Sequence, residues 1–123
     1  MGIFELMEEN GHEEILFCYN KPTRLKAIIA IHNTTLGSAV GGCRLWKYAS
    51  EEDALVDALV LSRVMTYQSA VADSDTGGGK AVLWKDFEEE TDPAVCCFII
   101  QYTWAKKIPR IVHLAHYTAC NLC

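Results

Sequence analysis

Gly77-Gly78-Gly79-Lys80-Ala81-Val82-Leu83-Trp84 is the stretch of sequence that decides the fold. Its second half, Ala81 to Trp84, is a short apolar run, which predicts a buried strand. The three glycines predict the end of a loop that begins at Asp73, because glycine tolerates backbone conformations that other residues rarely adopt. Lys80 would then stand at the start of the strand. The alternative interpretation is a flexible turn with a solvated lysine.

The glycine triplet fits neither of the two glycine-rich motifs that bind nucleotides. A P-loop needs a glycine five residues before its last glycine and Ser or Thr after the lysine; these positions are Ser74 and Ala81. A dinucleotide-binding fingerprint needs a third glycine where this chain has Val82, and a helix must follow it. We therefore do not expect the triplet to hold a nucleotide phosphate.

The rest of the chain supplies elements that can pair with this strand and cover it. Ser50 is a good N-cap, and the acidic residues after it favour a helix that runs to about Tyr67. Two apolar runs on either side of Asn20 to Thr23 predict a hairpin with one buried face. The predicted helices cover residues 2–10, 50–67 and 93–107, and the predicted strands cover 14–19, 25–31, 43–46 and 81–84. Together they predict a single α/β domain, with a mixed sheet of about five strands flanked by helices.

The amino-acid composition of the chain argues against some classes of binding partner. The 123 residues suit one domain, and 11 basic against 16 acidic residues give a net charge of −5. This balance argues against nucleic acid or an anionic membrane as the main partner. No run approaches the roughly 18 apolar residues that span a bilayer. The N-terminal residues do not form a secretory signal, so we interpret the six cysteines as reduced thiols of a cytoplasmic protein.

Five motifs stand in an order and spacing that match a known family. They are Leu25 to His32, Thr34 to Gly37, Gly41 to Arg44, Met65 to Tyr67, and Gly77 to Val82. With these motifs the chain resembles the N-terminal, substrate-binding and dimerisation domain of the Glu/Leu/Phe/Val amino-acid dehydrogenases. The phenylalanine and leucine dehydrogenases are the members that it resembles most. The resemblance covers about two thirds of the chain.

The resemblance implies a site and a reaction. Members of this family oxidise an L-amino acid to a 2-oxo acid and assemble as oligomers, and a second, Rossmann-type domain carries NAD. The lysine after the glycine triplet, Lys80 here, acts on the substrate amine or the attacking water. Such a lysine works as a base only where burial or a nearby cation favours its neutral form. The matching substrate-binding residues are Val40, Gly41, Gly42, Met65 and Gln68, and the glycine loop is Gly77, Gly78 and Gly79.

Three departures from the family pattern bear on activity. Gln68 stands where the family has a second lysine that grips the substrate carboxylate, so Lys80 or Arg44 would have to supply the positive charge. Val64 replaces a glycine. After Asp92 the chain contains no Asp or Glu, although the family has an aspartate in that region.

These departures suggest that residues 1–92 are the substrate-binding and dimerisation part, and that residues 93–123 are a helix and a divergent tail. No NAD domain follows within the 123 residues. We therefore expect the chain alone to bind no NAD and to be inactive, because hydride transfer needs a positioned cofactor. The alternative is a non-catalytic module that forms oligomers or binds amino acids.

Two further groups of side chains have simpler interpretations. The tail contains His113, His116, Cys120 and Cys123, which are possible zinc ligands, but a His-x2-His pair is not a usual spacing. We therefore predict no metal site. His32 is interpreted as a structural residue at the end of a strand.

Overall fold

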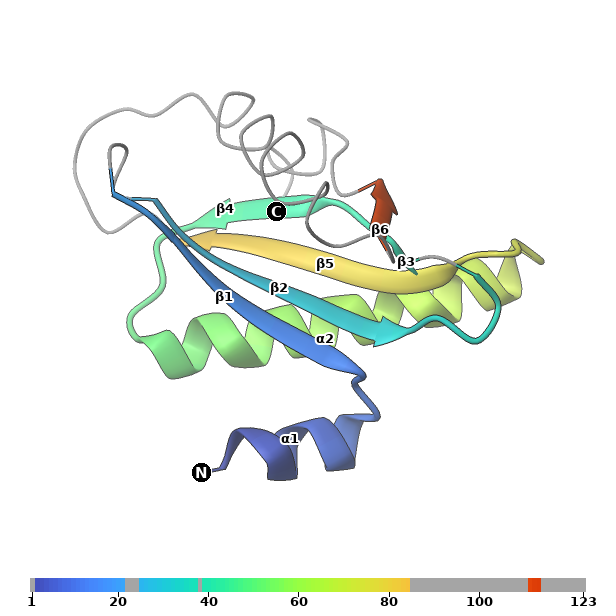
Figure 1. Ribbon diagram of the computed structural model, residues 1–123, viewed down its shortest axis with the longest axis horizontal. Coiled ribbons are helices and arrows are strands. Elements are labelled where there is room, and N and C mark those ends of the chain that lie inside the picture. The colour runs from blue at the N-terminus through green and yellow to red at the C-terminus, as the bar shows by residue number, and fades with distance from the viewer. Residues whose placement is uncertain (1, 22–24, 38, 85–110, 114–123) are drawn as a thin grey trace.

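The computed structural model describes residues 2–21, 25–37, 39–84 and 111–113. In these residues two helices accompany one sheet (Figure 1). The elements are α1 (Ile3–Asn10), β1 (Glu14–Asn20), β2 (Leu25–Asn33), β3 (Ala39–Val40), β4 (Cys43–Trp46), α2 (Glu51–Val71), β5 (Gly77–Trp84) and β6 (Ile111–His113). The predicted helix over residues 93–107 and the possible ligands at His116, Cys120 and Cys123 lie outside the described residues.

The sheet is mixed, as the sequence predicts. β1 pairs with β2, and β2 with β5, in antiparallel fashion. The other edge of β5 is shared by β3 and β4, which both run parallel to it, and β6 pairs parallel with β3. The α/β class is therefore confirmed. The described part of the sheet has six strands instead of about five, because β3 and β6 are short strands without a sequence pattern of their own.

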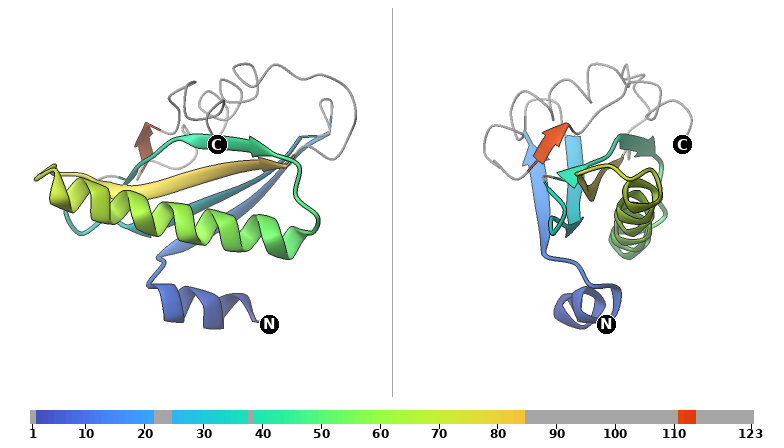
Figure 2. Two further views of the ribbon diagram at one scale, coloured as in Figure 1. Left: turned by 180° about the vertical axis from the view of Figure 1, so that it is seen from behind. Right: turned by 90° about the vertical axis from the view of Figure 1, so that its right-hand side faces the viewer.

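One face of the sheet is covered by α2 (Figure 2). Side chains alternate between the two faces of a strand, so Ile28, Ala30 and Val82 point toward α2. There they pack against buried small and branched residues of the helix, including Ala58 and Leu59. Small residues on both sides let the helix lie close to the strands.

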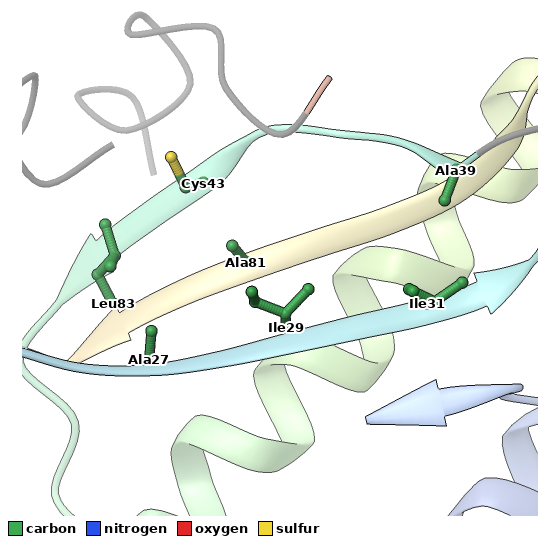
Figure 3. Packing of buried hydrophobic residues seen from close by; sticks show 7 residues of the cluster. All are labelled: Ala27, Ile29, Ile31, Ala39, Cys43, Ala81 and Leu83. Atoms are coloured by element: carbon green, nitrogen blue, oxygen red, sulfur yellow. The ribbon is translucent and has the colours of Figure 1, made fainter. Parts of the chain in front are cut away.

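The opposite face of the sheet carries a second apolar cluster (Figure 3). Its central members, Ile29, Ile31 and Leu83, are completely buried. The remaining members are Ala27, Ala39, Cys43 and Ala81. Residues 27–31 of β2 and 81–83 of β5 are thus apolar on both faces, which is typical of central strands.

The ends of the helices follow their capping residues. α2 begins where predicted, since the Ser50 hydroxyl accepts a hydrogen bond from the backbone N–H of Asp53 at 3.1 Å. It continues to Val71 instead of ending near Tyr67, because no glycine or proline stops it earlier. α1 ends at Gly11, whose φ of 81° is the left-handed conformation that glycine adopts without strain.

Two of the predicted strands begin or end at other residues than expected. Gly77, Gly78 and Gly79 belong to β5 and not to a loop, because β2 and β3 provide partners for this part of the strand. The strand predicted over residues 25–31 is two residues longer, since β2 extends to Asn33 through its pairing with β5. Local glycine content pointed to a turn, and tertiary pairing overrides it.

Candidate functional site

The glycine triplet is the place where neighbouring backbones come closest to β5. A Cβ at Gly78 would overlap the backbone nitrogen and hydroxyl of Thr66, and would lie 2.6 Å from Thr66 Cα. A Cβ at Gly77 would lie 2.9 Å from Gly37 O and would overlap Asn33 O. The triplet therefore serves close packing of strand and helix, and it gives the backbone no open cradle for a phosphate.

A segment with two more glycines lies along the other edge of β5. Val40 pairs with Gly78, and Gly42 O accepts a hydrogen bond from the backbone N–H of Ala81 at 3.1 Å. Between them, a Cβ at Gly41 would overlap Gly79 O. The structure thus brings Val40, Gly41 and Gly42 together with the residues that flank Lys80.

Lys80 occupies the middle of β5 and is buried, with 7% of its surface exposed. By strand alternation its side chain leaves the sheet on the same face as Gly78 and Val82, which is the face that α2 covers. A lysine fixed on a central strand and shielded from bulk water has a defined position. The alternative of a solvated lysine on a flexible turn is wrong.

The two predicted residues of α2 differ in their surroundings. Met65 is half-buried, next to Thr66, which packs on Gly78. Gln68 is exposed and lines a shallow surface hollow with Val64, Tyr67, Val71 and Ala72. Gln68 therefore faces open space at the C-terminal half of α2, where a ligand or another segment could reach it.

Arg44 forms an ion pair with Asp57. Its Nη1 lies 2.9 Å and 3.2 Å from the two carboxylate oxygens of Asp57, and its guanidinium stacks over the Trp46 ring at 4.6 Å. The hydroxyl of Tyr48 donates to the same carboxylate. This ion pair fastens β4 to α2, and it occupies the charge that Arg44 could otherwise offer a substrate carboxylate.

A buried polar cluster, missed by the sequence analysis, lies near the triplet. His12 Nε2 is 2.7 Å from Ser62 Oγ, and His32 Nδ1 is 2.8 Å from Thr66 Oγ1. Burial, reinforced by the nearby His32, lowers the pKa of His12 from 6.5 to about 4. No signal in the sequence joins His12 to Ser62, since 50 positions separate them. The structural interpretation of His32 agrees with these contacts.

The described residues lack the features of a metal site, a membrane-spanning helix or a nucleotide-binding loop. Among the described residues no three His, Cys, Asp or Glu side chains gather as metal ligands would. Within that portion neither helix has the length and apolar character needed to cross a membrane. The described residues also do not fit NAD at the triplet, because its backbone is buried in a strand and no helix begins there.

Comparison with known proteins agrees with this geometry. The family model described as "Glu/Leu/Phe/Val dehydrogenase, dimerisation domain" matches residues 14–114. The L-tryptophan dehydrogenase of Nostoc punctiforme is 55% identical over 92 residues, which are 75% of this chain and 26% of that protein. The phenylalanine dehydrogenase of Thermoactinomyces intermedius is 52% identical over 91 residues, 74% of this chain and 25% of the relative. The chain thus spans about a quarter of the length of these relatives.

Solved structures show the same fold. The crystal structure of L-tryptophan dehydrogenase from Nostoc punctiforme matches with a TM-score of 0.79 and 43% identity, over 94% of this chain and 34% of that one. A glutamate dehydrogenase matches with a TM-score of 0.63 at 17% identity, covering 94% of this chain and 28% of the other, a likeness of fold alone. The family match extends to residue 114, beyond the motifs that carry the resemblance. The chain belongs to the Glu/Leu/Phe/Val dehydrogenase family and matches its dimerisation domain.

Proposed function

We propose that the chain provides the substrate-binding and oligomerising half of an NAD-dependent L-amino-acid dehydrogenase. Its substrate would be an amino acid with a large apolar side chain, such as phenylalanine, leucine or tryptophan, which would be deaminated oxidatively to the 2-oxo acid. The observation that carries the proposal is the fixed, buried position of Lys80 on β5, between the Val40–Gly42 segment and α2.

Each proposed residue has a role that suits its place. Lys80 would move a proton at the substrate amine or at the attacking water. Val40, Gly41 and Gly42 would lie along the substrate, and Met65 would contact its apolar side chain. NAD would supply the hydride acceptor, and it would be held by residues other than those described, because the triplet does not fit a dinucleotide.

Gln68 is the residue of this site that should limit the affinity for the substrate carboxylate. A lysine at this position would hold the substrate carboxylate with a charged hydrogen bond, which contributes roughly 1.5–3 kcal/mol, against about 1 kcal/mol for a neutral one. Arg44 does not replace that charge, because it is paired with Asp57. We therefore expect weak binding of amino acids and no turnover by these 123 residues alone.

The second candidate is a non-catalytic module that forms oligomers or binds amino acids. The glutamine at position 68 favours it, because the loss of a charged carboxylate ligand removes substrate affinity before it affects the fold. In this case the chain would associate with itself, or with a longer member of the family, without contributing to turnover.

Calorimetry and an activity assay on the purified 123-residue chain separate the proposal from a module that only forms oligomers. Phenylalanine, leucine and tryptophan would be titrated with and without NAD, and the formation of NADH would be followed in parallel. Weak binding of at least one amino acid without turnover supports the proposal. A complete lack of amino-acid binding favours a module that only oligomerises, and turnover by the isolated chain would contradict the expected inactivity.

A further inference from the structure

His32 connects three elements beside the glycine triplet. From β2, its Nε2 lies 2.8 Å from the carbonyl oxygen of Asn10 at the end of α1, and its Nδ1 lies 2.8 Å from the Thr66 hydroxyl on α2. A carbonyl oxygen can only accept, so Nε2 carries the proton of the neutral ring. Nδ1 is then an acceptor, and the Thr66 hydroxyl donates to it at 2.8 Å in preference to Ser62 O, which lies 3.5 Å away. The docked end of α1 therefore selects the tautomer that holds Thr66.

Thr66 determines how α2 meets β5. Its backbone occupies the space where a Cβ of residue 78 would be, so the helix rests directly on the strand at Gly78. Gly78 lies two residues before Lys80 in β5 and pairs with Val40. A change in the orientation of Thr66 would thus alter the position of β5, which carries Lys80, and of the Val40–Gly42 segment beside it.

We infer that His32 is a positioning residue for the substrate site, because it holds Thr66 against Gly78 and is itself oriented by α1. It acts through Thr66 and not on the substrate. Docking of α1 and the geometry of β5 around Lys80 are consequently one coupled equilibrium. The inference rests on the proposed function only in treating the strand around Lys80 as part of the site.

A second histidine makes this arrangement sensitive to acid. The ring of His12 stands edge-on to that of His32, with 4.7 Å between the centroids. The Ser62 hydroxyl donates to Leu59 O at 3.0 Å, so it accepts from His12 Nε2–H, and His12 Nδ1 stays buried with no hydrogen-bond partner in the described part of the chain. A proton on Nδ1 would create a buried cation, and of the groups that affect its pKa only the Leu59 backbone favours the charged form.

The charged groups around His12 do not offset such a cation. Arg63 on α2 and His32 on β2 both disfavour it. The nearest acid in sequence, Glu13, is exposed and accepts hydrogen bonds from the backbone and side chain of Thr34. Protonation of His12 would therefore disfavour the folded arrangement in which its ring packs against that of His32.

An acid titration of the full 123-residue chain, followed by NMR, tests the coupling without any substitution. The amide signals of α1 and of Gly78, Gly79 and Lys80 should change together, with the same midpoint as the His12 ring. The amide of Leu83 in the same strand should keep its signal over this range. Glycine amides that stay unchanged while α1 detaches would overturn the inference.

Two substitutions of His32 separate its two hydrogen bonds. Asn places an acceptor where Nδ1 was, and Gln places a donor where Nε2 was. His32→Gln should keep α1 ordered, but should lower hydrogen-exchange protection at Gly78 and Gly79 by about fivefold, the effect of one lost hydrogen bond. Thr66→Val should do the same. His32→Asn should free α1 and, because the side chain is then no longer oriented by Asn10, should also lower that protection by about twofold or more.

A purely structural role for His32 predicts a different pattern. Both substitutions would then weaken α1 and the glycine strand alike, and that result would contradict the inference. If a variant does not fold, the acid titration of the unmodified chain still tests the inference. No part of the test uses an amino acid or NAD, so its failure can be distinguished from failure of the proposed function.

Discussion

Gly78 is a position at which a single methyl group should have a large effect on the sheet. Gly78→Ala should lower the free energy of unfolding by about 2–3 kcal/mol, because its Cβ would force α2 away from β5. Urea unfolding followed by circular dichroism measures the difference. Gly2→Ala is the matched control, since its Cβ would meet no atom closer than 3.6 Å. Equal unfolding midpoints for the two variants would show that the contact with Thr66 yields easily.

His12 makes the stability of the protein depend on pH. Its pKa is about 4 in the folded chain and returns to 6.5 on unfolding, so the unfolded chain binds the proton more readily. The stabilisation is complete above pH 6.5 and is lost as the pH falls toward 4. Its size is about 3 kcal/mol, from the difference between the two pKa values.

Urea unfolding at pH 7 and at pH 4.5 measures this loss. His12→Gln is the control, because glutamine keeps a donor toward Ser62 but does not titrate. The unmodified chain should lose more stability between the two pH values than the variant does. An identical loss in both proteins would assign the acid sensitivity to other groups.

At the scale of elements, Ser50 fixes the start of α2. Ser50→Ala removes the acceptor for the Asp53 N–H and should cost about 1 kcal/mol of stability, whereas Ser50→Asp should keep it. Thermal unfolding of the two variants provides the comparison. If alanine and aspartate destabilise the chain equally, the cap does not stabilise the helix as its geometry indicates.

The sequence predicts an element well when the element depends on interactions between residues that are close together in the chain. The start of α2 at Ser50 and the hairpin of β1 and β2 depend on local chemistry, and both were predictable. β3 has only two residues, and it is a strand because β5 lies beside it. The glycine triplet looked like a loop because its pairing partners, β2 and β3, are distant in sequence.

Some residues of the candidate site could be predicted from the sequence, and others could not. Lys80 and the Val40–Gly42 segment were predictable from a resemblance of motifs, and the structure brings them onto one strand and its edge. The cluster of His12, His32 and Thr66 was not, because its members are far apart in sequence and have no shared motif. Only the fold places them together.

At the scale of the whole molecule, the chain spans about a quarter of the length of its relatives, so its chemistry is best tested in a chimera. Residues 1–92 would be joined to the remainder of the Nostoc punctiforme L-tryptophan dehydrogenase. This replaces the part of the chain that has no Asp or Glu. Gln68→Lys in the chimera should improve substrate affinity by about tenfold, or about 1.4 kcal/mol. Unchanged affinity in a folded, active chimera would mean that another group holds the carboxylate.

The most direct test of the central claim is the turnover of the Gln68→Lys chimera with and without Lys80. Formation of NADH would be measured at several concentrations of phenylalanine, leucine and tryptophan, so that kcat and KM are separated. Lys80→Ala should lower kcat by about a hundredfold or more and change KM much less, because a general acid–base group acts mainly in the transition state. An unchanged kcat after this substitution would contradict the assignment of Lys80, and with it the proposed site.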